Sequence, residues 1–140
     1  MKWLLLSGLF VIASCANSKK TNNTKELDGF VTTPTGLKYK IIQEGKGEPA
    51  RAGNEVLIFE TTSYLDGTVL YSNENSTNPV KVLIGGHQAT DGVDEGLRGM
   101  RTGEIRTLIA PPHLVKRTTY PDNVSPDSTL SIRVILHKIL

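Results

Sequence analysis

Apolar and polar residues alternate along several stretches of the chain, and this alternation predicts β-strands. A first strand is expected over residues 37–41, where apolar residues alternate with lysines, and a longer one over 54–65 (NEVLIFETTSYL), which is rich in β-branched and aromatic residues. The Asp66-Gly67 pair then favours a tight turn into a strand at 68–71, as in a β-hairpin. Further strands are expected at 79–84, 104–110 and 128–140.

One stretch, residues 91–104 (DGVDEGLRGMRTGE), has the spacing of a helix instead. Its large apolar residues recur at i, i+4 and i+7 and so share one face, namely Val93, Leu97 and Met100. Asp91 is expected to cap the start of this helix, and Gly103 to supply the left-handed residue that ends it. The pattern therefore predicts an α+β unit, an antiparallel sheet with one helix packed across it.

The first 14 residues are typical of a targeting segment. Lys2 precedes a mostly apolar run, residues 3–13, that is too short to span a bilayer as a stable helix. The run leads into Ile12-Ala13-Ser14-Cys15, which resembles a bacterial lipobox, where cleavage precedes a cysteine that is then acylated. An ordinary signal peptide followed by a chance cysteine is the alternative.

The residues that follow predict a tether and then one folded domain. Residues 16–31 are polar and lack apolar periodicity, so residues 15–31 are interpreted as a lipidated Cys15 and a flexible tether. Residues 32–140 form the expected domain, which is long enough to bury one core. An acylated cysteine would anchor this domain to a membrane without spanning it.

Charge and cysteine usage exclude several classes of protein. The chain carries 16 Lys and Arg against 14 Asp and Glu, and removing residues 1–14 removes Lys2, which leaves 15 against 14. This balance and the absence of a run of like charges give no reason to expect a nucleic-acid partner. Cys15 is the only cysteine, which excludes an internal disulfide and a CxxC redox motif.

A reactive or metal-binding site is not recognisable in the sequence. His87, His113 and His137 lie far apart, with no i, i+4 partner and no cysteine to complete a metal site. The chain has no G-x-S-x-G nucleophile turn and no G-x-G-x-x-G cofactor loop. We therefore expect no metal and no cofactor, and composition and spacing alone indicate a small α+β domain without a recognisable catalytic group.

Four segments resemble the FKBP-type peptidyl-prolyl cis-trans isomerases, in the family's order and over roughly residues 32–140. The strongest signals are Gly-x-x-Glu-Gly-Leu-x-x-Met-x-x-Gly-Glu at 92–104, Pro111-Pro112, and Pro-x-x-Thr-Leu at 126–130. The entry motif Thr-x-x-Gly-Leu-x-Tyr at 33–39 is similar to the bacterial branch of the family. The resemblance implies an FKBP-like half-wrapped antiparallel sheet of about five strands around one short helix.

The reaction of this family explains why no reactive side chain is needed. Amide resonance keeps the X–Pro bond planar, and rotation faces a barrier of roughly 18–20 kcal/mol. Resonance is lost at the top of the barrier, so an apolar pocket favours the twisted state over the solvated planar one without a nucleophile or a proton transfer. The expected site is therefore a pocket of large apolar residues that grips the proline ring.

The resemblance also places this pocket, and most of its residues differ here from the family's pattern. Val93 takes the place of a tryptophan at the pocket floor, Glu60 that of a tyrosine, and Lys116 that of the tyrosine in an Ala-Tyr-Gly turn. A one-residue bulge in the strand would put Phe59 at the pocket in place of Glu60. If Glu60 and Lys116 both lie at the rim, they are in a position to pair across it. The remaining pocket candidates are Leu70, Tyr71, Val80, Ala89, Thr90, Val124 and Ile132.

Two hypotheses about function follow. The first is an FKBP-type peptidyl-prolyl isomerase lipoprotein of the cell envelope that assists the folding of exported proteins, with reduced activity because its pocket has diverged. The second is a catalytically inactive FKBP-like chaperone or partner-binding module. Either protein is expected to bind proline-containing polypeptides and to reach a membrane through the lipid anchor at Cys15. The expected location is the outer membrane or the periplasmic face rather than the cytoplasm.

Overall fold

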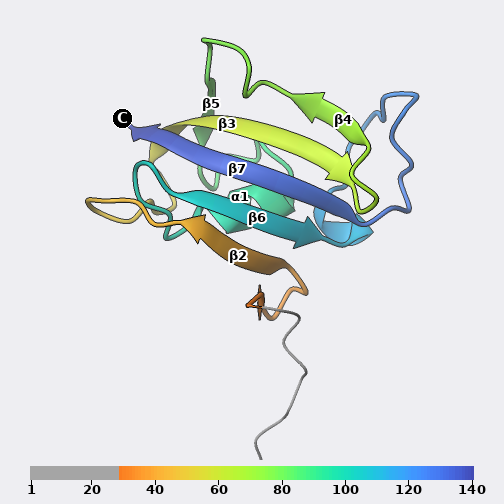
Figure 1. The fold of residues 1–140 in the computed structure, drawn as a ribbon, viewed down its shortest axis with the longest axis horizontal. Helices are drawn as coiled ribbons and strands as arrows, with labels where there is room; N and C mark the ends of the chain where they lie inside the picture. The colour runs from red at the N-terminus through yellow and green to blue at the C-terminus, as the bar shows by residue number, and fades with distance from the viewer. Residues whose placement is uncertain (1–28) are drawn as a thin grey trace, which may run out of the picture.

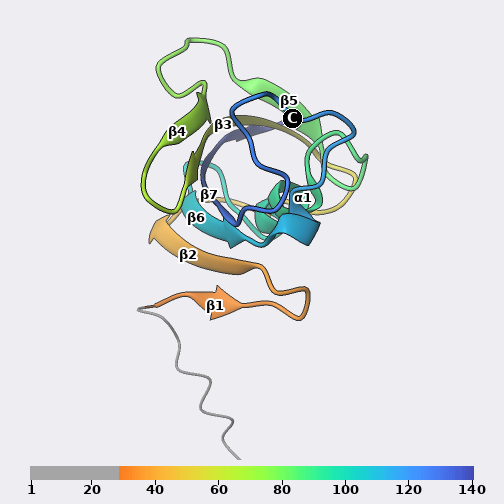
Figure 2. The same ribbon diagram turned by 90° about the vertical axis from the view of Figure 1, so that its right-hand side faces the viewer.

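The structure of the protein, a computed structural model, describes residues 29–140. In this part of the chain one antiparallel sheet of seven strands curves around one α-helix, α1 (Asp91–Leu97), as Figures 1 and 2 show. The strands are β1 (Val31–Thr32), β2 (Lys38–Gln43), β3 (Glu55–Tyr64), β4 (Val69–Ser72), β5 (Val80–Leu83), β6 (Ile105–Ala110) and β7 (Leu130–Ile139). The α+β class and the half-wrapped antiparallel sheet around one short helix are thereby confirmed, with seven strands where about five were expected.

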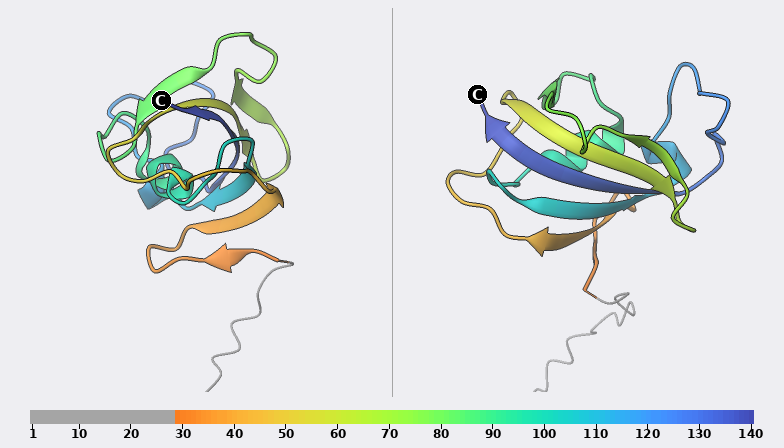
Figure 3. Two further views of the ribbon diagram at one scale, coloured as in Figure 1. Left: turned by 90° about the vertical axis from the view of Figure 1, so that its left-hand side faces the viewer. Right: turned by 45° about the horizontal axis from the view of Figure 1, so that its top comes forward.

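The strand order brings distant parts of the sequence together. It runs β1-β2-β6-β7-β3-β4, so β7 lies between β6 and β3 at the centre of the sheet. β5 also pairs with β3, along residues 55–58, whereas β4 pairs with its other half, along residues 61–63. In Figure 3 the concave side of this sheet holds α1, and the connections at one end of the strands arch over it.

The core lies between the concave face of the sheet and α1. Alternate residues of β3 and β7 point inward, and they include Val56, Ile58, Leu130, Ile132, Val134 and Leu136, all almost fully buried. The helix packs very closely on β6 at Gly96. A Cβ atom there would lie 2.4 Å from Leu108 Cδ1, so any residue other than glycine would force the Leu108 side chain to move.

The helix has the predicted buried face but not the predicted ends. Val93, Leu97 and Met100 are all buried, as the spacing predicts. The N-cap residue is Thr90 rather than Asp91, and no side-chain hydrogen bond caps the helix. The helix ends at Leu97, before the predicted stop at Gly103, because Gly99 already adopts a positive φ of +81°.

A buried ion pair joins β6 to the end of the helix. Arg106 lies on the inward face of β6, and its Nε donates to Glu104 Oε1 at 2.5 Å. Its Nη1 donates to the backbone oxygens of Gly96 and Arg98, each at 3.2 Å, which satisfies carbonyls that the helix end leaves free. The guanidinium also lies 4.9 Å from the centre of the Tyr39 ring. This cation therefore complements the negative end of the helix dipole from inside the protein.

Residues 29–140 contain neither a membrane-spanning helix nor a group of metal ligands. No helix in this range is long and apolar enough to cross a membrane. No three His, Cys, Asp or Glu residues in the same range are grouped so that they would hold a metal ion. The predicted signal peptide and the predicted lipid anchor at Cys15 lie outside the described residues.

Candidate functional site

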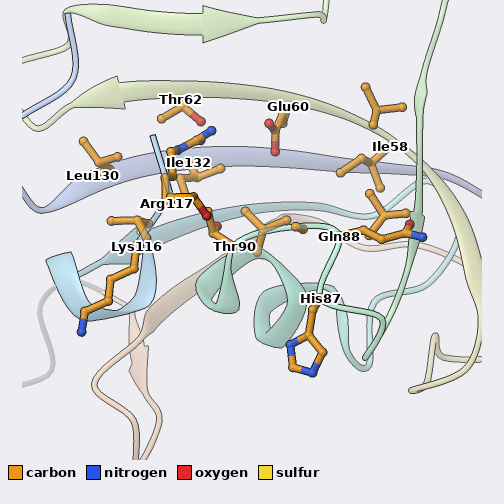
Figure 4. A pocket seen from close by; sticks show the side chains of 16 residues that line it. Ile58, Glu60, Thr62, His87, Gln88, Thr90, Lys116, Arg117, Leu130 and Ile132 are labelled. Carbon is orange, nitrogen blue, oxygen red and sulfur yellow. The ribbon is translucent and has the colours of Figure 1, made fainter. Parts of the chain in front are cut away.

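A hollow of about 360 Å³ lies between the concave face of the sheet and the start of α1 (Figure 4). Val93 lies at its base, where the first turn of the helix meets the sheet. Val93 is only 5% exposed, so it belongs to the core and to the hollow at once. Other apolar lining residues come from β3, β5 and β7 and include Ile58, Val82, Leu130 and Ile132.

Polar residues surround this apolar base. Glu60 and Thr62 project from β3, and the 87–90 loop before α1 closes one side. The opposite side is formed by residues 115–118, which follow the short 3-10 helix at Pro112–Leu114. In the described part of the chain, the lining of this hollow contains no Phe, Tyr or Trp. The hollow is therefore apolar at its base but lacks aromatic walls.

A second, smaller hollow of about 220 Å³ adjoins the first between β4 and the 117–124 segment. Both hollows are lined by Glu60, Thr62, Arg117 and Leu130. The second also has Leu70, Tyr71 and Val124, and Tyr71 is the aromatic ring of the combined site. We call the two adjoining hollows together the trough. The four shared residues lie at the boundary between its two parts.

The structure brings every predicted pocket candidate to this trough. The first hollow is lined by Glu60, Val80, Ala89, Thr90, Val93, Lys116 and Ile132, and the second by Leu70, Tyr71, Val124 and again Glu60. The alternative residue Phe59 lies elsewhere, on the outer face, where its ring meets that of His137 edge-on at 5.5 Å. The irregularities in pairing do not break the alternation within β3, because Val56, Ile58 and Thr62 all remain inward.

Sequence reasoning missed several residues of the trough. Ile58 and Thr62 lie two positions on either side of Glu60, so the period of a strand was sufficient to find them. His87, Gln88, Arg117 and Thr118 lie in irregular segments, where no periodic signal indicates which side chains turn inward. Arg117 matters most among these, because it lines both hollows.

The position of Glu60 is fixed by its backbone. Its N–H donates to Asn73 Oδ1 at 2.7 Å, and its carbonyl accepts from the Asn73 N–H at 3.1 Å. Asn73 is itself buried. It bonds to β3 at the position between the part that pairs with β5 and the part that pairs with β4. The Glu60 side chain consequently points from the sheet toward the helix, into the hollow (Figure 4).

The carboxyl of Glu60 is poorly solvated and weakly paired. Burial raises the pKa of Glu60 above its ordinary value of 4.5, and the positive charge of Arg117 opposes this rise in part. No hydrogen bond to this carboxyl is formed by any residue in the 29–140 range. Glu60 does not pair with Lys116 across the rim, because the charged end of Lys116 points away from the hollow whereas Arg117 reaches into it (Figure 4).

The segment that carries Arg117 is tied to the sheet. The Tyr64 hydroxyl donates to the Asn123 carbonyl and accepts from the Ser125 N–H, both at 2.9 Å. The Arg117 N–H donates to the Tyr120 hydroxyl at 3.3 Å. These bonds hold the loop over the trough, so the orientation of Arg117 relative to Glu60 is set by β3 and by the loop itself.

The raised pKa of Glu60 leads to a prediction about stability. Ionisation of Glu60 costs more in the folded than in the unfolded protein, so the folded state binds more protons and loses stability as pH rises above about 4.5. Glu60→Gln is expected to raise the free energy of unfolding at pH 7 by on the order of 1 kcal/mol and to have no effect below pH 4. Urea unfolding at both pH values measures this difference.

Glu48→Gln is the control, because Glu48 lies on an exposed loop. It is expected to leave the stability unchanged at either pH. A Glu60→Gln variant that is less stable than the unaltered protein at pH 7 would contradict the described environment of this carboxyl.

Comparison with known proteins identifies related sequences. Residues 46–137 match the family described as FKBP-type peptidyl-prolyl cis-trans isomerase. The chain is 31% identical to the peptidyl-prolyl cis-trans isomerase Mip of Chlamydia muridarum over 126 residues, which are 89% of this chain and 49% of that protein. It is 36% identical to FK506-binding protein 2 of Yarrowia lipolytica over 96 residues, 68% of this chain and 67% of that protein.

Some relatives are much longer than this chain. FKBP10 of Bos taurus is 42% identical over 67 residues, which are 48% of this chain but 12% of that protein. The chain thus spans about an eighth of FKBP10 and about half of Mip.

Solved structures share the fold. FkpA from Escherichia coli superposes with a TM-score of 0.71 at 26% identity, over 81% of this chain and 53% of that one. AtFKBP13 superposes with a TM-score of 0.70 at 24% identity, over 79% of this chain and 98% of that one, which shows likeness of fold alone.

Proposed function

Because the chain belongs to the FKBP-type peptidyl-prolyl cis-trans isomerase family, we propose that it binds proline-containing polypeptides in the hollow above Val93 and isomerises their X–Pro bonds at a reduced rate. One observation carries this proposal: an apolar hollow with Val93 at its base lies where the family resemblance places the substrate pocket. The absence of aromatic side chains from the lining of this hollow supports the reduced rate.

The apolar base supplies the part of the catalysis that needs no reactive group. A proline ring over Val93 and Ile132 leaves water, and the twisted amide, whose charge separation is lower, is favoured there over the planar one. A tryptophan in the place of Val93 would offer on the order of 200 Å² of rigid contact surface, most of which valine lacks. Glu60 and Arg117 keep part of the site polar, which weakens the preference for the twisted state.

The proposal is tested by NMR exchange spectroscopy on a short X–Pro peptide with protein purified without residues 1–15. We expect faster cis–trans exchange, and we expect Val93→Trp to raise the catalysed rate by up to tenfold, equivalent to about 1.4 kcal/mol of barrier. Val69→Trp introduces the same ring on an exposed position of β4, outside the trough, and is expected to leave the rate unchanged.

The second candidate is an inactive FKBP-like chaperone or partner-binding module. It is favoured by the charged pair Glu60 and Arg117, which stand in a trough that the reaction needs to be dry. In the same experiment this candidate predicts chemical-shift changes at the trough on peptide addition without faster exchange. That result would overturn the isomerase proposal and leave the binding function.

We further propose that the protein is a lipoprotein of the cell envelope that assists the folding of exported proteins. The support is the run at residues 1–14 followed by Cys15, which has the pattern of a lipoprotein signal peptide. Acyl chains on Cys15 would hold the domain close to the outer membrane or the periplasmic face, with residues 16–31 as the tether. Isomerisation at this location would act on X–Pro bonds of chains that fold after export.

A further inference from the structure

Arg117 occupies an unusual place in the trough. It lines both hollows, so its side chain stands between the base over Val93 and the ring of Tyr71. Figure 4 shows the guanidinium extending into the site, whereas the neighbouring Lys116 points outward. A peptide that fills both hollows must therefore displace Arg117 or bind to it.

Positive and negative side chains lie in different parts of the trough. Glu60 is the one acidic residue among those that line the two hollows, and of the two cations Lys116 and Arg117 only Arg117 extends toward it. His87 also lines the first hollow, with its ring turned away from the sheet in Figure 4. The opening of the trough is thus cationic on the side of residues 116–117, while the carboxylate lies deeper.

Glu60 and Arg117 influence one another through their charges and do not form an ion pair. The charge of Arg117 acts on Glu60, but no hydrogen bond between their side chains is formed. Guanidinium groups form their strongest pairs when two parallel N–H groups donate to one carboxylate. The planar fork of Arg117 can therefore donate two hydrogen bonds to a better-oriented carboxylate of a bound peptide.

We propose that Arg117 is a specificity-determining residue that selects proline-containing segments with an acidic side chain next to the proline. The carboxylate of that side chain replaces Glu60 as the partner of the Arg117 guanidinium. It draws the guanidinium toward the opening, and the two hollows join because Arg117 no longer stands between them. A lysine or arginine in the same peptide position instead meets the like charge of Arg117. This inference rests on the proposed function, because it names the substrate class of the same site.

The test compares peptides that differ at one position, with Glu, Gln or Lys before the proline. NMR titration of protein purified without residues 1–15 gives the dissociation constants, and exchange spectroscopy gives the rates. We expect the Glu peptide to bind about tenfold more tightly than the Lys peptide, with the Gln peptide between them. Arg117→Gln is expected to reduce this preference to twofold or less.

Lys116→Gln is the matched control, because it removes the same charge from the adjacent residue, whose side chain points out of the trough. It is expected to retain most of the preference. An unaltered protein that binds all three peptides equally would overturn the inference. Equal losses in both variants would also overturn it, since net charge and not the position of Arg117 would then set the preference.

The two proposals fail in different ways. If no peptide exchanges faster but the Glu peptide still binds best through Arg117, the isomerase function is overturned and the specificity of the site is supported. If exchange is accelerated equally for the three peptides, the isomerase function is supported and the role of Arg117 is overturned.

Discussion

Replacing Arg106 by alanine is expected to lower the free energy of unfolding by about 3–5 kcal/mol. Arg106 and Glu104 are 8% and 2% exposed, and the Glu104 carboxylate also accepts from the Arg101 N–H at 2.9 Å. Without the guanidinium, Glu104 becomes an uncompensated buried charge, and the carbonyls at the end of α1 lose their partner. Urea unfolding at neutral pH measures the effect.

Lys81→Ala provides the comparison for this loss. It breaks the pair of Lys81 with Glu55, in which both side chains are about half exposed, and a change within about 1 kcal/mol is expected. The double variant Glu104→Leu with Arg106→Met removes both buried charges, so it should lose less than Arg106→Ala alone. If Arg106→Ala costs no more than Lys81→Ala, the pair does not hold the helix end as described.

Replacing Cys15 by alanine is expected to move most of the protein from the membrane fraction to the soluble fraction. Each methylene of an acyl chain buried in the bilayer contributes about 0.8 kcal/mol, so losing the acylated cysteine removes the proposed anchor. Fractionation followed by immunodetection measures the distribution.

Ser18→Ala is the control for the anchor, because it changes the proposed tether three residues beyond Cys15 and leaves the lipobox-like sequence intact. This variant is expected to remain in the membrane fraction. If the Cys15→Ala protein also remains there as a lipid-anchored protein, the lipoprotein interpretation is wrong.

The fold was largely predictable because its elements have regular periods. The inward-facing residues of β3 follow from a spacing of two residues, and the buried face of α1 follows from a spacing of three to four. The ends of the helix were not predictable in this way. Met100 is buried although it lies beyond the helix, because its N–H bonds to the Leu97 carbonyl in a turn that continues the apolar face. Strand β1 is two residues long and too short to show any period.

The site was predictable where it lies on strands and on the helix, and less so in its loops. Val93 and Glu60, which the resemblance singled out, both line the trough, because regular elements fix their direction. It singled out Lys116, but the inward residue of that loop is Arg117, a difference of one position that no periodicity determines. The buried charge of Arg106 carried a weak signal, since it shares the alternation of Leu108 and Ala110 on β6.

The central position of β7 has a consequence for biogenesis. Strands β2 and β6 on one side and β3, β4 and β5 on the other meet only through residues 130–139. A nascent chain that lacks residues 130–139 therefore cannot join these two groups of strands. Pairing between strands that lie far apart in the sequence is also slow. The sheet therefore closes only after β7 has been synthesised, so the last strand of the described chain completes the fold.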